Sequence, residues 1–323
     1  MYGALIIGIR TRGLAWARAV RAHPGFRLAG VADSDPEVLA GRGDELGLAA
    51  SERHADYRRA LAGGSCELAI VVVPNYLHYR VARDVLEAGL PCLLEKPFAE
   101  TLAEAEELVD LAERRRLPLV IAQNYRFKRP FQLMAQAIRA GSLGPLQGVE
   151  ASFHRHRPPR WEHERTMRYP LLFLQAIHHL DWLLGCLPAP IDELECRHGL
   201  PAGSPWQSPS QCRLLLRCRD GVLVSYSGSY ECLGEQTPFN GLWRLEFRDG
   251  DLVLDQAGAL RRIRGEERSL LYEEGQEERS SDELLLDTVH EAIARGTEAP
   301  TSGRRNLNTL RLLFRVIERG EAG

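Results

Sequence analysis

The sequence is poor in several features that mark particular classes of protein. No apolar stretch approaches the ~18 residues that cross a bilayer, which excludes a membrane-spanning helix. The formal net charge is only −3, so the strongly basic character of most nucleic-acid-binding proteins is missing. The N-terminus has no basic segment ahead of its apolar residues, so no signal peptide is predicted. We therefore expect a cytoplasmic protein with neither a membrane nor a nucleic-acid partner.

Paired cysteines are also missing. The seven cysteines, at positions 66, 92, 186, 196, 212, 218 and 232, include no CxxC motif. An odd number of thiols without such a motif indicates reduced, mostly buried side chains. We predict no metal site; a metal cluster at these cysteines is the alternative.

Lysine is nearly absent. Lys96 and Lys128 are the only lysines, and every other member of the Lys+Arg total of 41 is arginine. Lys96 lies in the stretch LLEKPFAE, between a glutamate and a proline at the end of an apolar run. The use of lysine at this position requires an explanation.

Apolar runs alternate with amphipathic helical patterns through the first third of the chain. Strands are expected at Ala4–Gly8, Phe26–Asp33, Cys66–Pro74, Pro91–Pro97 and Leu117–Asn124, and helices at Arg12–His23, Asp35–Gly47, Tyr79–Gly89 and Thr101–Arg116. Asp35 and Thr101 are predicted helix caps. Near-continuous apolar strands followed by helices predict an α/β fold with a doubly wound parallel sheet over residues 1–123.

The pattern changes in the remainder, residues 124–323. Strands are expected within 146–156, 191–199, 211–231 and 243–256, with Asp-Gly turns at 220–221 and 249–250. Helices are expected at 170–185, 282–296 and 304–320. This predicts a second, α+β domain with an open, mostly antiparallel sheet that binds substrate and mediates oligomerisation.

The first strand is followed by the turn GIRTRG, Gly8–Gly13. The pattern GxGxxG at this place holds a pyrophosphate at a helix N-terminus. Here the outer glycines are present and the middle one is Arg10, which either pairs with phosphate oxygens or blocks the site. Asp33 ends the second strand, where an acid hydrogen-bonds a ribose 2′-hydroxyl and favours NAD over NADP; the alternative is a turn or cap residue.

The chain resembles the Gfo/Idh/MocA family of oxidoreductases. The resemblance rests on Pro74-Asn75 with His78, Glu95-Lys96-Pro97, Tyr125-Arg126-Phe127, Ile177–Gly185 and Ala299–Leu313. It implies a Rossmann domain, a bound NAD or NADP and hydride transfer at a carbon that bears oxygen or nitrogen.

Further roles follow from this resemblance. The implied cofactor-binding residues are Gly8, Ile9, Arg10, Thr11, Arg12, Gly13, Asp33, Pro74, Asn75, His78, Glu95 and Lys96. Lys96 would hydrogen-bond the reacting hydroxyl or the nicotinamide ribose, with Glu95 orienting it. Lysine can lose its proton when desolvated near another cation, whereas arginine essentially cannot, so a proton relay would explain the lysine. The alternative is an ion pair at a strand end, and for His78 it is packing at a helix start.

His178 matches the catalytic histidine of the family, but the family's aspartate four residues earlier is replaced by Leu174. His178 is still a candidate general acid or base, because its pKa lies naturally near neutrality. His179 is a candidate substrate contact, with a buried structural histidine as the alternative.

The stretch Ser152–Pro170 is dense in arginine and histidine. In the family this region lines the substrate pocket, so Arg155, Arg160 and Trp161 are candidate substrate-binding residues. Tyr125 and Arg126 of the matching Tyr125-Arg126-Phe127 motif are further candidates. Several arginines would suit an anionic substrate, such as a sugar acid, a sugar phosphate or an imine. A solvated loop is the alternative.

Three functions remain open. The first is an NAD(P)-dependent dehydrogenase or reductase of a small hydroxylated or imino substrate. The second is a non-catalytic binding homologue, favoured by Arg10 and Leu174. The third is a lyase or hydrolase with tightly bound NAD. An open sheet would expose apolar surface, so we also expect a homodimer or homotetramer.

Overall fold

The structure is a computed structural model that describes residues 1–321 of the chain, apart from the side chain of His163. It divides into two compact units. Unit 1 comprises Met1–Asn124 together with Arg279–Asn308, and unit 2 comprises Tyr125–Glu278 together with the chain from Thr309 onward. The first junction lies one residue from the predicted boundary. The prediction placed Arg279–Asn308 in the second domain, whereas this segment packs in unit 1, where Asp287 lies 2.9 Å from His23 Nε2.

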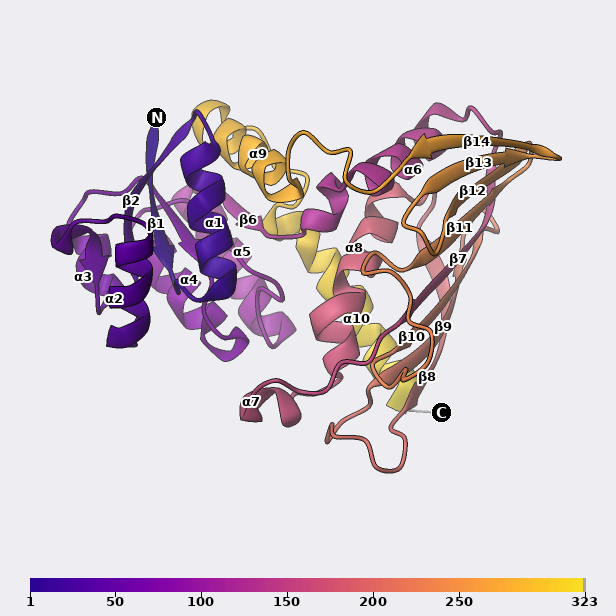
Figure 1. The fold of residues 1–323 in the computed structure, drawn as a ribbon, viewed down its shortest axis with the longest axis horizontal. Helices are drawn as coiled ribbons and strands as arrows, with labels where there is room; N and C mark the ends of the chain where they lie inside the picture. The colour runs from indigo at the N-terminus through magenta and orange to yellow at the C-terminus, as the bar shows by residue number, and fades with distance from the viewer. Residues whose placement is uncertain (322–323) are drawn as a thin grey trace. The chain divides into compact units, whose positions relative to one another are not determined.

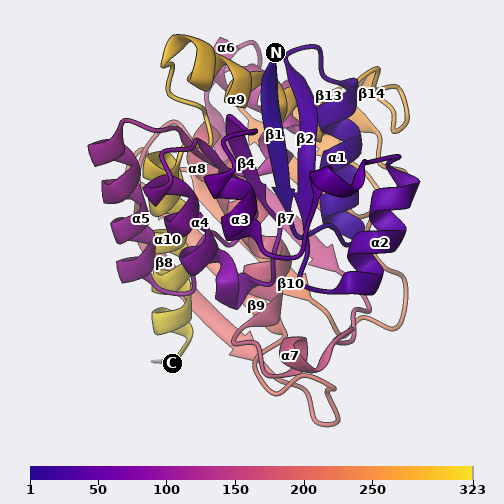
Figure 2. The ribbon, with the colours of Figure 1, turned by 90° about the vertical axis from the view of Figure 1, so that its left-hand side faces the viewer.

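Unit 1 contains a six-stranded parallel sheet in the order β3-β2-β1-β4-β5-β6, as predicted for a doubly wound domain. The strands are β1 Tyr2–Ile7, β2 Phe26–Ala32, β3 Arg53–His54, β4 Leu68–Val71, β5 Cys92–Leu94 and β6 Leu119–Ile121. The helices are α1 Thr11–Ala22, α2 Pro36–Glu45, α3 Tyr57–Ala62, α4 His78–Glu87, α5 Leu102–Arg115 and α9 Ser281–Arg295. Figure 2 shows α1 and α2 on one side of β1, β2 and β4, with α4 and α5 on the other.

Local sequence signals account for the helix ends of this unit. The Asp35 carboxylate accepts hydrogen bonds from the backbone N–H groups of Glu37 and Val38, as a helix cap does. Thr101 and Glu104 form the predicted capping box at the start of α5. The short elements β3 and α3 were not predicted, because neither is long enough to show a periodic pattern.

Unit 2 contains an eight-stranded sheet in the order β14-β13-β12-β11-β7-β10-β9-β8. All neighbours are antiparallel except β7 and β10, which are parallel, so the predicted mostly antiparallel sheet is confirmed. The strands are β7 Leu146–His154, β8 Ile191–Gly199, β9 Gln211–Cys218, β10 Leu223–Ser229, β11 Leu242–Phe247, β12 Gly250–Leu254, β13 Leu260–Arg264 and β14 Glu267–Tyr272. Strands β13 and β14 were not predicted.

Helices cover one face of this sheet (Figure 1). They are α6 Arg129–Ala140, a π-helical segment Leu172–Ala176 that runs into α8 Ile177–Cys186, and the C-terminal part of α10 Gly303–Glu321. The single turn α7 Glu162–Arg165 lies in the connection between β7 and the π-helical segment. Phe131, Trp182 and Trp243 pack edge to face in the core, with ring centroids 5.1–5.4 Å apart. The other face carries exposed leucines, including Leu215 and Leu223.

Candidate active site and cofactor-binding turn

The turn between β1 and α1 keeps the geometry of a nucleotide-binding turn at its two glycines. Gly8 has a φ of +91°, and a Cβ there would lie 2.3 Å from the carbonyl oxygen of Val72. A Cβ at Gly13 would lie 1.8 Å from the carbonyl oxygen of Gly8. Both positions therefore require glycine, one for its left-handed backbone and one for the close approach of α1 to the turn. Ile9 is buried between them, and Thr11 begins α1.

Beside this turn lies a cavity of about 460 Å³ at the carboxyl ends of β1, β2 and β4. Ligands bind at this edge of open α/β sheets. Its lining includes Gly8, Arg10, Asp33, Tyr57 and Pro74. The cavity is large enough for part of a dinucleotide, so the residues present fit such a cofactor.

Asp33 holds the turn and also faces the cavity. Its carboxylate accepts hydrogen bonds from the backbone N–H groups of Ile9 and Asp35, each at 3.0 Å, and so fixes the turn. The same side chain lines the cavity. A carboxylate accepts at about four lone-pair positions, which leaves capacity for a ribose hydroxyl.

The two arginines of the turn point to different partners. Arg10 is exposed, and its guanidinium donates to Asp35 Oδ2 at 2.7 Å. Solvent screens an exposed pair of this kind, so it contributes little to stability and a phosphate could displace it. Arg12 instead donates to Glu95 and to both carboxylate oxygens of Asp282 on α9. The predicted cofactor contact from the Arg12 guanidinium is therefore not what this structure shows, because two carboxylates hold the group.

Glu95 follows β5 and is held in its ionised form. Burial alone would raise the pKa of its carboxyl group, but the charges of Arg12 and Lys96 and a hydrogen bond from Trp16 Nε1 (2.9 Å) lower it. Its other oxygen, Oε2, lies 3.3 Å from the backbone nitrogen of Lys96. Lys96 is half-buried beside this fixed negative charge.

His78 joins the two loops that carry the predicted cofactor-binding residues. Its ring is buried, with Nδ1 2.5 Å from the carbonyl oxygen of Pro97 and Nε2 2.8 Å from that of Val73. It therefore holds the loop that contains Pro74 and Asn75 against the loop that contains Lys96. This is the packing role considered for His78.

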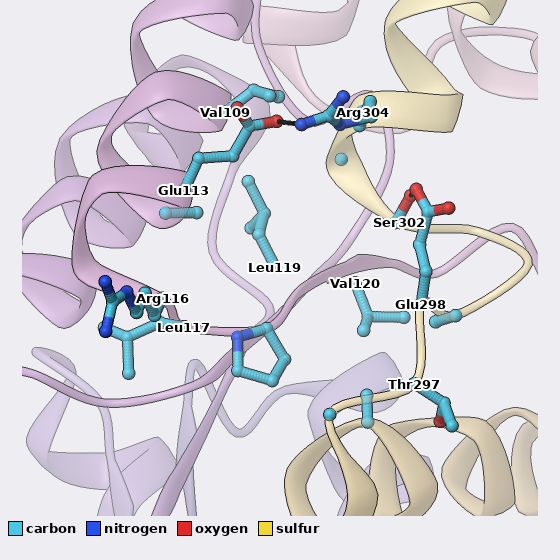
Figure 3. A pocket seen from close by; sticks show the side chains of 16 residues that line it. Val109, Glu113, Arg116, Leu117, Leu119, Val120, Thr297, Glu298, Ser302 and Arg304 are labelled. Carbon is cyan, nitrogen blue, oxygen red and sulfur yellow. Dashed lines mark hydrogen bonds and ion pairs between the residues drawn. The ribbon is translucent and has the colours of Figure 1, made fainter.

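A second cavity in unit 1 lies away from the carboxyl ends of the strands. It measures about 550 Å³ and lies between α5, the start of β6 and the segment 297–304 (Figure 3). Glu113 and Arg304 form an ion pair at its rim, at 2.7 Å. It adjoins the amino end of β6, opposite to the strand ends where such sheets bind ligands, so it is not the cofactor candidate.

In unit 2, His178 lies on the ring of Tyr125. The two rings are stacked, with centroids 4.7 Å apart and planes 14° apart, and His178 is 8% exposed. Tyr125 donates to the carbonyl oxygen of Phe239 at 2.9 Å and accepts from Gln175 at 2.7 Å. Its phenol is thus fixed from two sides, which fixes the surface on which His178 rests.

The residue that replaces the family's aspartate lies in the π-helical segment. Leu174 belongs to Leu172–Ala176, in which hydrogen bonds span five residues. Such a turn places the residues four and five before His178 nearest to its face, and these are Leu174 and Phe173. Neither carries a carboxylate, so the substitution seen in the sequence is not compensated within this turn.

His179 is completely buried beneath this surface. Gln175 Nε2 lies 3.3 Å from its Nε2, and Tyr226 Oη lies 3.1 Å from its Nδ1. Burial, with the nearby charge of Lys128, lowers the pKa of His179 to about 3. It is a neutral core residue here, which supports the structural alternative rather than the predicted substrate contact.

Arg126 is also engaged within its unit. Its guanidinium forms two hydrogen bonds with the Asp181 carboxylate and one with the Asp181 carbonyl oxygen. Gly185 makes room for it, since a Cβ there would lie 2.3 Å from Arg126 Nη1. The predicted substrate contact of Arg126 is thus replaced by a buried ion pair that joins the segment after β6 to α8.

The arginine-rich stretch is divided between internal contacts and solvent. Arg155 donates to the carbonyl oxygen of Thr237 at 2.8 Å, and Arg157 pairs with Glu164 at 2.9 Å. The side chain of Arg160 is exposed, and Trp161 is 62% exposed. The last two therefore remain accessible to a ligand. The side chain of His163 lies outside the described part of the structure.

Lys128 is a site residue that the sequence interpretation left without a role. Its Nζ lies 3.7 Å from the ring centroid of Tyr125 and donates to Asn240 Oδ1 at 2.6 Å. The sequence does single out Lys128, because it is the second of two lysines in an arginine-rich chain. Its proximity to Tyr125 could not be derived without the fold.

Comparisons with known proteins agree with this arrangement. Residues 3–123 match the model of the oxidoreductase family with an NAD-binding Rossmann fold, and residues 131–248 match the Gfo/Idh/MocA C-terminal domain. An uncharacterised oxidoreductase of Schizosaccharomyces pombe is 39% identical over 30% of this chain and 26% of its own length. D-Apiose dehydrogenase of Rhizobium rhizogenes is 26% identical over 37% of this chain and 34% of its own length. The chain is thus aligned to well under two-thirds of the length of these two relatives.

The similarity to solved structures extends over nearly the whole chain, unlike these two sequence matches. A solved oxidoreductase from Agrobacterium radiobacter, in complex with NAD+, L-tartaric acid and magnesium, superposes with a TM-score of 0.90. The match covers 99% of this chain and 96% of that one, at 20% identity. No helix among residues 1–321 is both long and apolar enough to cross a membrane. The predicted family is confirmed in both parts of the chain: this protein belongs to the Gfo/Idh/MocA family of oxidoreductases.

Proposed function

We propose that this protein is an NAD(P)-dependent oxidoreductase of a small hydroxylated or imino substrate that carries negative charge. The observation that carries the proposal is the cavity at the carboxyl ends of β1, β2 and β4, bounded by the Gly8–Gly13 turn, Asp33 and Pro74. An open α/β sheet binds its ligand at this edge. The D-apiose dehydrogenase relative favours a sugar-like substrate.

The cofactor would be held by unit 1. The N–H groups at the start of α1 would face its pyrophosphate, Arg10 would leave Asp35 to pair with it, and Asp33 would accept from a ribose hydroxyl. A carboxylate disfavours a 2′-phosphate, so NAD is preferred over NADP. The bound nicotinamide would supply or take up the hydride.

Two residues of the chain would move the proton. Lys96 would donate to, and accept from, the reacting oxygen or nitrogen, with Glu95 holding its loop in place. His178 would be a second acid–base group, oriented by Tyr125 beneath it. Arg160 and Trp161, which are exposed, would contact the substrate's charged and apolar parts. Arg155 would keep its internal hydrogen bond to the carbonyl oxygen of Thr237.

The first experiment is titration of the purified protein with NADH and NADPH, followed by tryptophan quenching. We expect saturable binding with a preference for NADH, and Asp33→Asn should reduce that preference. Arg10→Gly restores the missing glycine and serves as the matched variant. If only Arg10→Gly binds, Arg10 closes the site, and the non-catalytic alternative is correct.

The second experiment tests the proton relay. Once a screen of sugar acids, aldoses and cyclic imines has identified a substrate, Lys96→Ala should lower kcat by about 10²–10⁴. Lys96→Arg should be similarly impaired, because arginine keeps the charge but cannot release a proton. Activity of Lys96→Arg near that of the parent would show that charge alone is needed. Reaction without net NADH change would point to the lyase or hydrolase alternative.

A further inference from the structure

The strongest unexplained cluster in the molecule lies in unit 2, away from the residues discussed above. Cys196 and His198 alternate on β8, the edge strand of the eight-stranded sheet, so their side chains point to the same face. His198 is directly opposite Cys212 on β9. Three donor side chains of the kinds that bind soft and borderline metals therefore meet at one place.

The distances within this cluster are those of a metal site. The sulfur atoms of Cys196 and Cys212 are 3.6 Å apart, and Cys196 Sγ lies 3.8 Å from His198 Nδ1 and 3.7 Å from Nε2. One ligand atom from each of the three residues lies within 4.8 Å of the others. A tetrahedral zinc ion, with Zn–S of about 2.3 Å and Zn–N of about 2.0–2.1 Å, separates its sulfurs by about 3.8 Å and a sulfur from a nitrogen by about 3.6 Å.

The environment of the imidazole also fits a ligand. His198 Nε2 lies 3.2 Å from the carbonyl oxygen of Val316 on α10, which can accept its N–H. Metal-binding histidines are usually oriented in this way by a backbone carbonyl, which leaves the other ring nitrogen for the metal. Gly320 gives the ring its space, because a Cβ at this position would lie 2.1 Å from His198 Cδ2.

The two thiols are shielded from solvent, whereas the histidine is partly exposed to it. Cys196 and Cys212 are 2% and 1% exposed, whereas His198 is half-buried. A metal could enter on the histidine side, and a solvent molecule could complete its coordination. The absence of CxxC motifs favours no metal site, but the two thiols are brought together here by the pairing of β8 and β9, which leaves no such motif in the sequence.

We propose that Cys196, His198 and Cys212 bind one Zn²⁺ ion, with a fourth position open to solvent. Binding would release the two thiol protons, and the two thiolates would balance the charge of the ion. The site would join the edge strand β8 to β9 and, through His198, to α10. It would stabilise unit 2 without taking part in hydride transfer.

The test is metal analysis of the whole protein. Chain purified without chelator and equilibrated with zinc should retain about one zinc per chain after gel filtration. Cobalt in its place should give thiolate charge-transfer absorption and visible bands of tetrahedral intensity. Cys212→Ser and His198→Gln should lose both signals. Cys218→Ser, which removes another buried thiol of β9, should keep them.

A second measurement does not depend on the folding of the variants. Alkylation of each cysteine in the unaltered protein is followed by mass spectrometry with and without zinc. Zinc at ten times its dissociation constant should slow the alkylation of Cys196 and Cys212 about tenfold and leave half-buried Cys232 unaffected. The proposal is overturned if the folded protein retains no more zinc than Cys212→Ser, if Cys218→Ser loses zinc equally, or if a Cys196–Cys212 disulfide is found instead.

Discussion

At the scale of single residues, Arg126 and Asp181 form a buried ion pair in which each charge depends on the other. Their side chains are 16% and 2% exposed, and Asp181 also accepts a hydrogen bond from Thr309 at 2.8 Å. Burial would lower the pKa of Arg126, but the Asp181 charge raises it, so the guanidinium stays charged. A buried charge is tolerated only while its partner is present.

Asp181→Asn should therefore destabilise the protein strongly. The variant leaves the Arg126 charge buried without its counter-charge, which costs about 3–5 kcal/mol of unfolding free energy. Urea denaturation measures this loss. The control is Asp249→Asn in the exposed pair with Arg248, whose side chains are 46% and 62% exposed, so solvent screens the pair and a far smaller loss is expected. Equal losses in the two variants would contradict the assignment of Arg126 to the interior.

His179 should make stability depend on pH. Its pKa is about 3 in the folded protein, against an ordinary value of 6.5, because it is buried. Below pH 6.5 the unfolded chain binds a proton that the folded chain does not, so stability rises with pH and is lost as the pH falls from about 6.5 toward 3. The slope contributed is at most about 1.4 kcal/mol per pH unit.

Urea unfolding at pH 7 and pH 5 measures this dependence. His179 alone should lower the unfolding free energy by about 2 kcal/mol between these values. His179→Gln should show a shallower dependence, whatever its stability at pH 7. An unchanged slope in this variant would mean that His179 takes up its proton over the same pH range in the folded and unfolded chains, so that its pKa is not lowered by burial.

At the scale of elements, the β1–α1 turn is the most constrained junction. Gly8 combines a left-handed backbone with a carbonyl oxygen where its Cβ would be. Gly89, at the end of α4, has a similar φ of +82° but nothing within 4 Å of its Cβ position. Alanine substitutions at the two positions therefore distinguish the cost of a left-handed backbone from the cost of a steric clash.

Gly8→Ala should be much more harmful than Gly89→Ala. Left-handed strain alone costs about 1–2 kcal/mol, which is the loss expected at Gly89. At Gly8 the clash with Val72 must also move β4 or the turn, so we expect a larger loss of unfolding free energy and loss of NADH binding. Thermal unfolding and cofactor titration measure both. Similar losses of unfolding free energy at Gly8 and Gly89 would contradict this expectation, because they would show that the turn can rearrange to admit a Cβ atom.

At the scale of the whole molecule, the open face of the eight-stranded sheet is the main unassigned surface. Leu215 and Leu223 lie on neighbouring strands β9 and β10 and are 44% and 48% exposed. Exposed apolar side chains that gather on one sheet face favour association between protein chains.

We expect a homodimer or homotetramer that uses this face. Sedimentation at micromolar concentration should give a mass that is a multiple of 36.2 kDa. Leu215→Arg should dissociate the assembly, whereas Leu233→Arg, at a loop position that is 80% exposed, should not. A mass of one chain for the parent protein would contradict the prediction.

The sequence by itself determined the fold class and the helix caps, because strand and helix periodicities, Asp35 and Thr101 act over a few neighbouring residues. The family was indicated by the resemblance of motifs such as Glu95-Lys96-Pro97. It also placed Gly8, Gly13 and Asp33 around one turn. It could not assign α6, whose apolar residues recur at helical spacing but carry no recognised motif, or the short elements β3 and α3.

Only the tertiary structure decided which polar side chains are held by partners within the protein. Arg12 meets Asp282 across 270 positions, Arg126 meets Asp181 across 55, and Cys196 meets Cys212 through strand pairing. A charged or metal-binding side chain takes its role from partners that the fold brings within a few ångströms, and such partners leave no periodic signal in the chain. The sequence therefore supplied the candidate residues, and their three-dimensional partners distinguished those held in the interior from those left for a ligand.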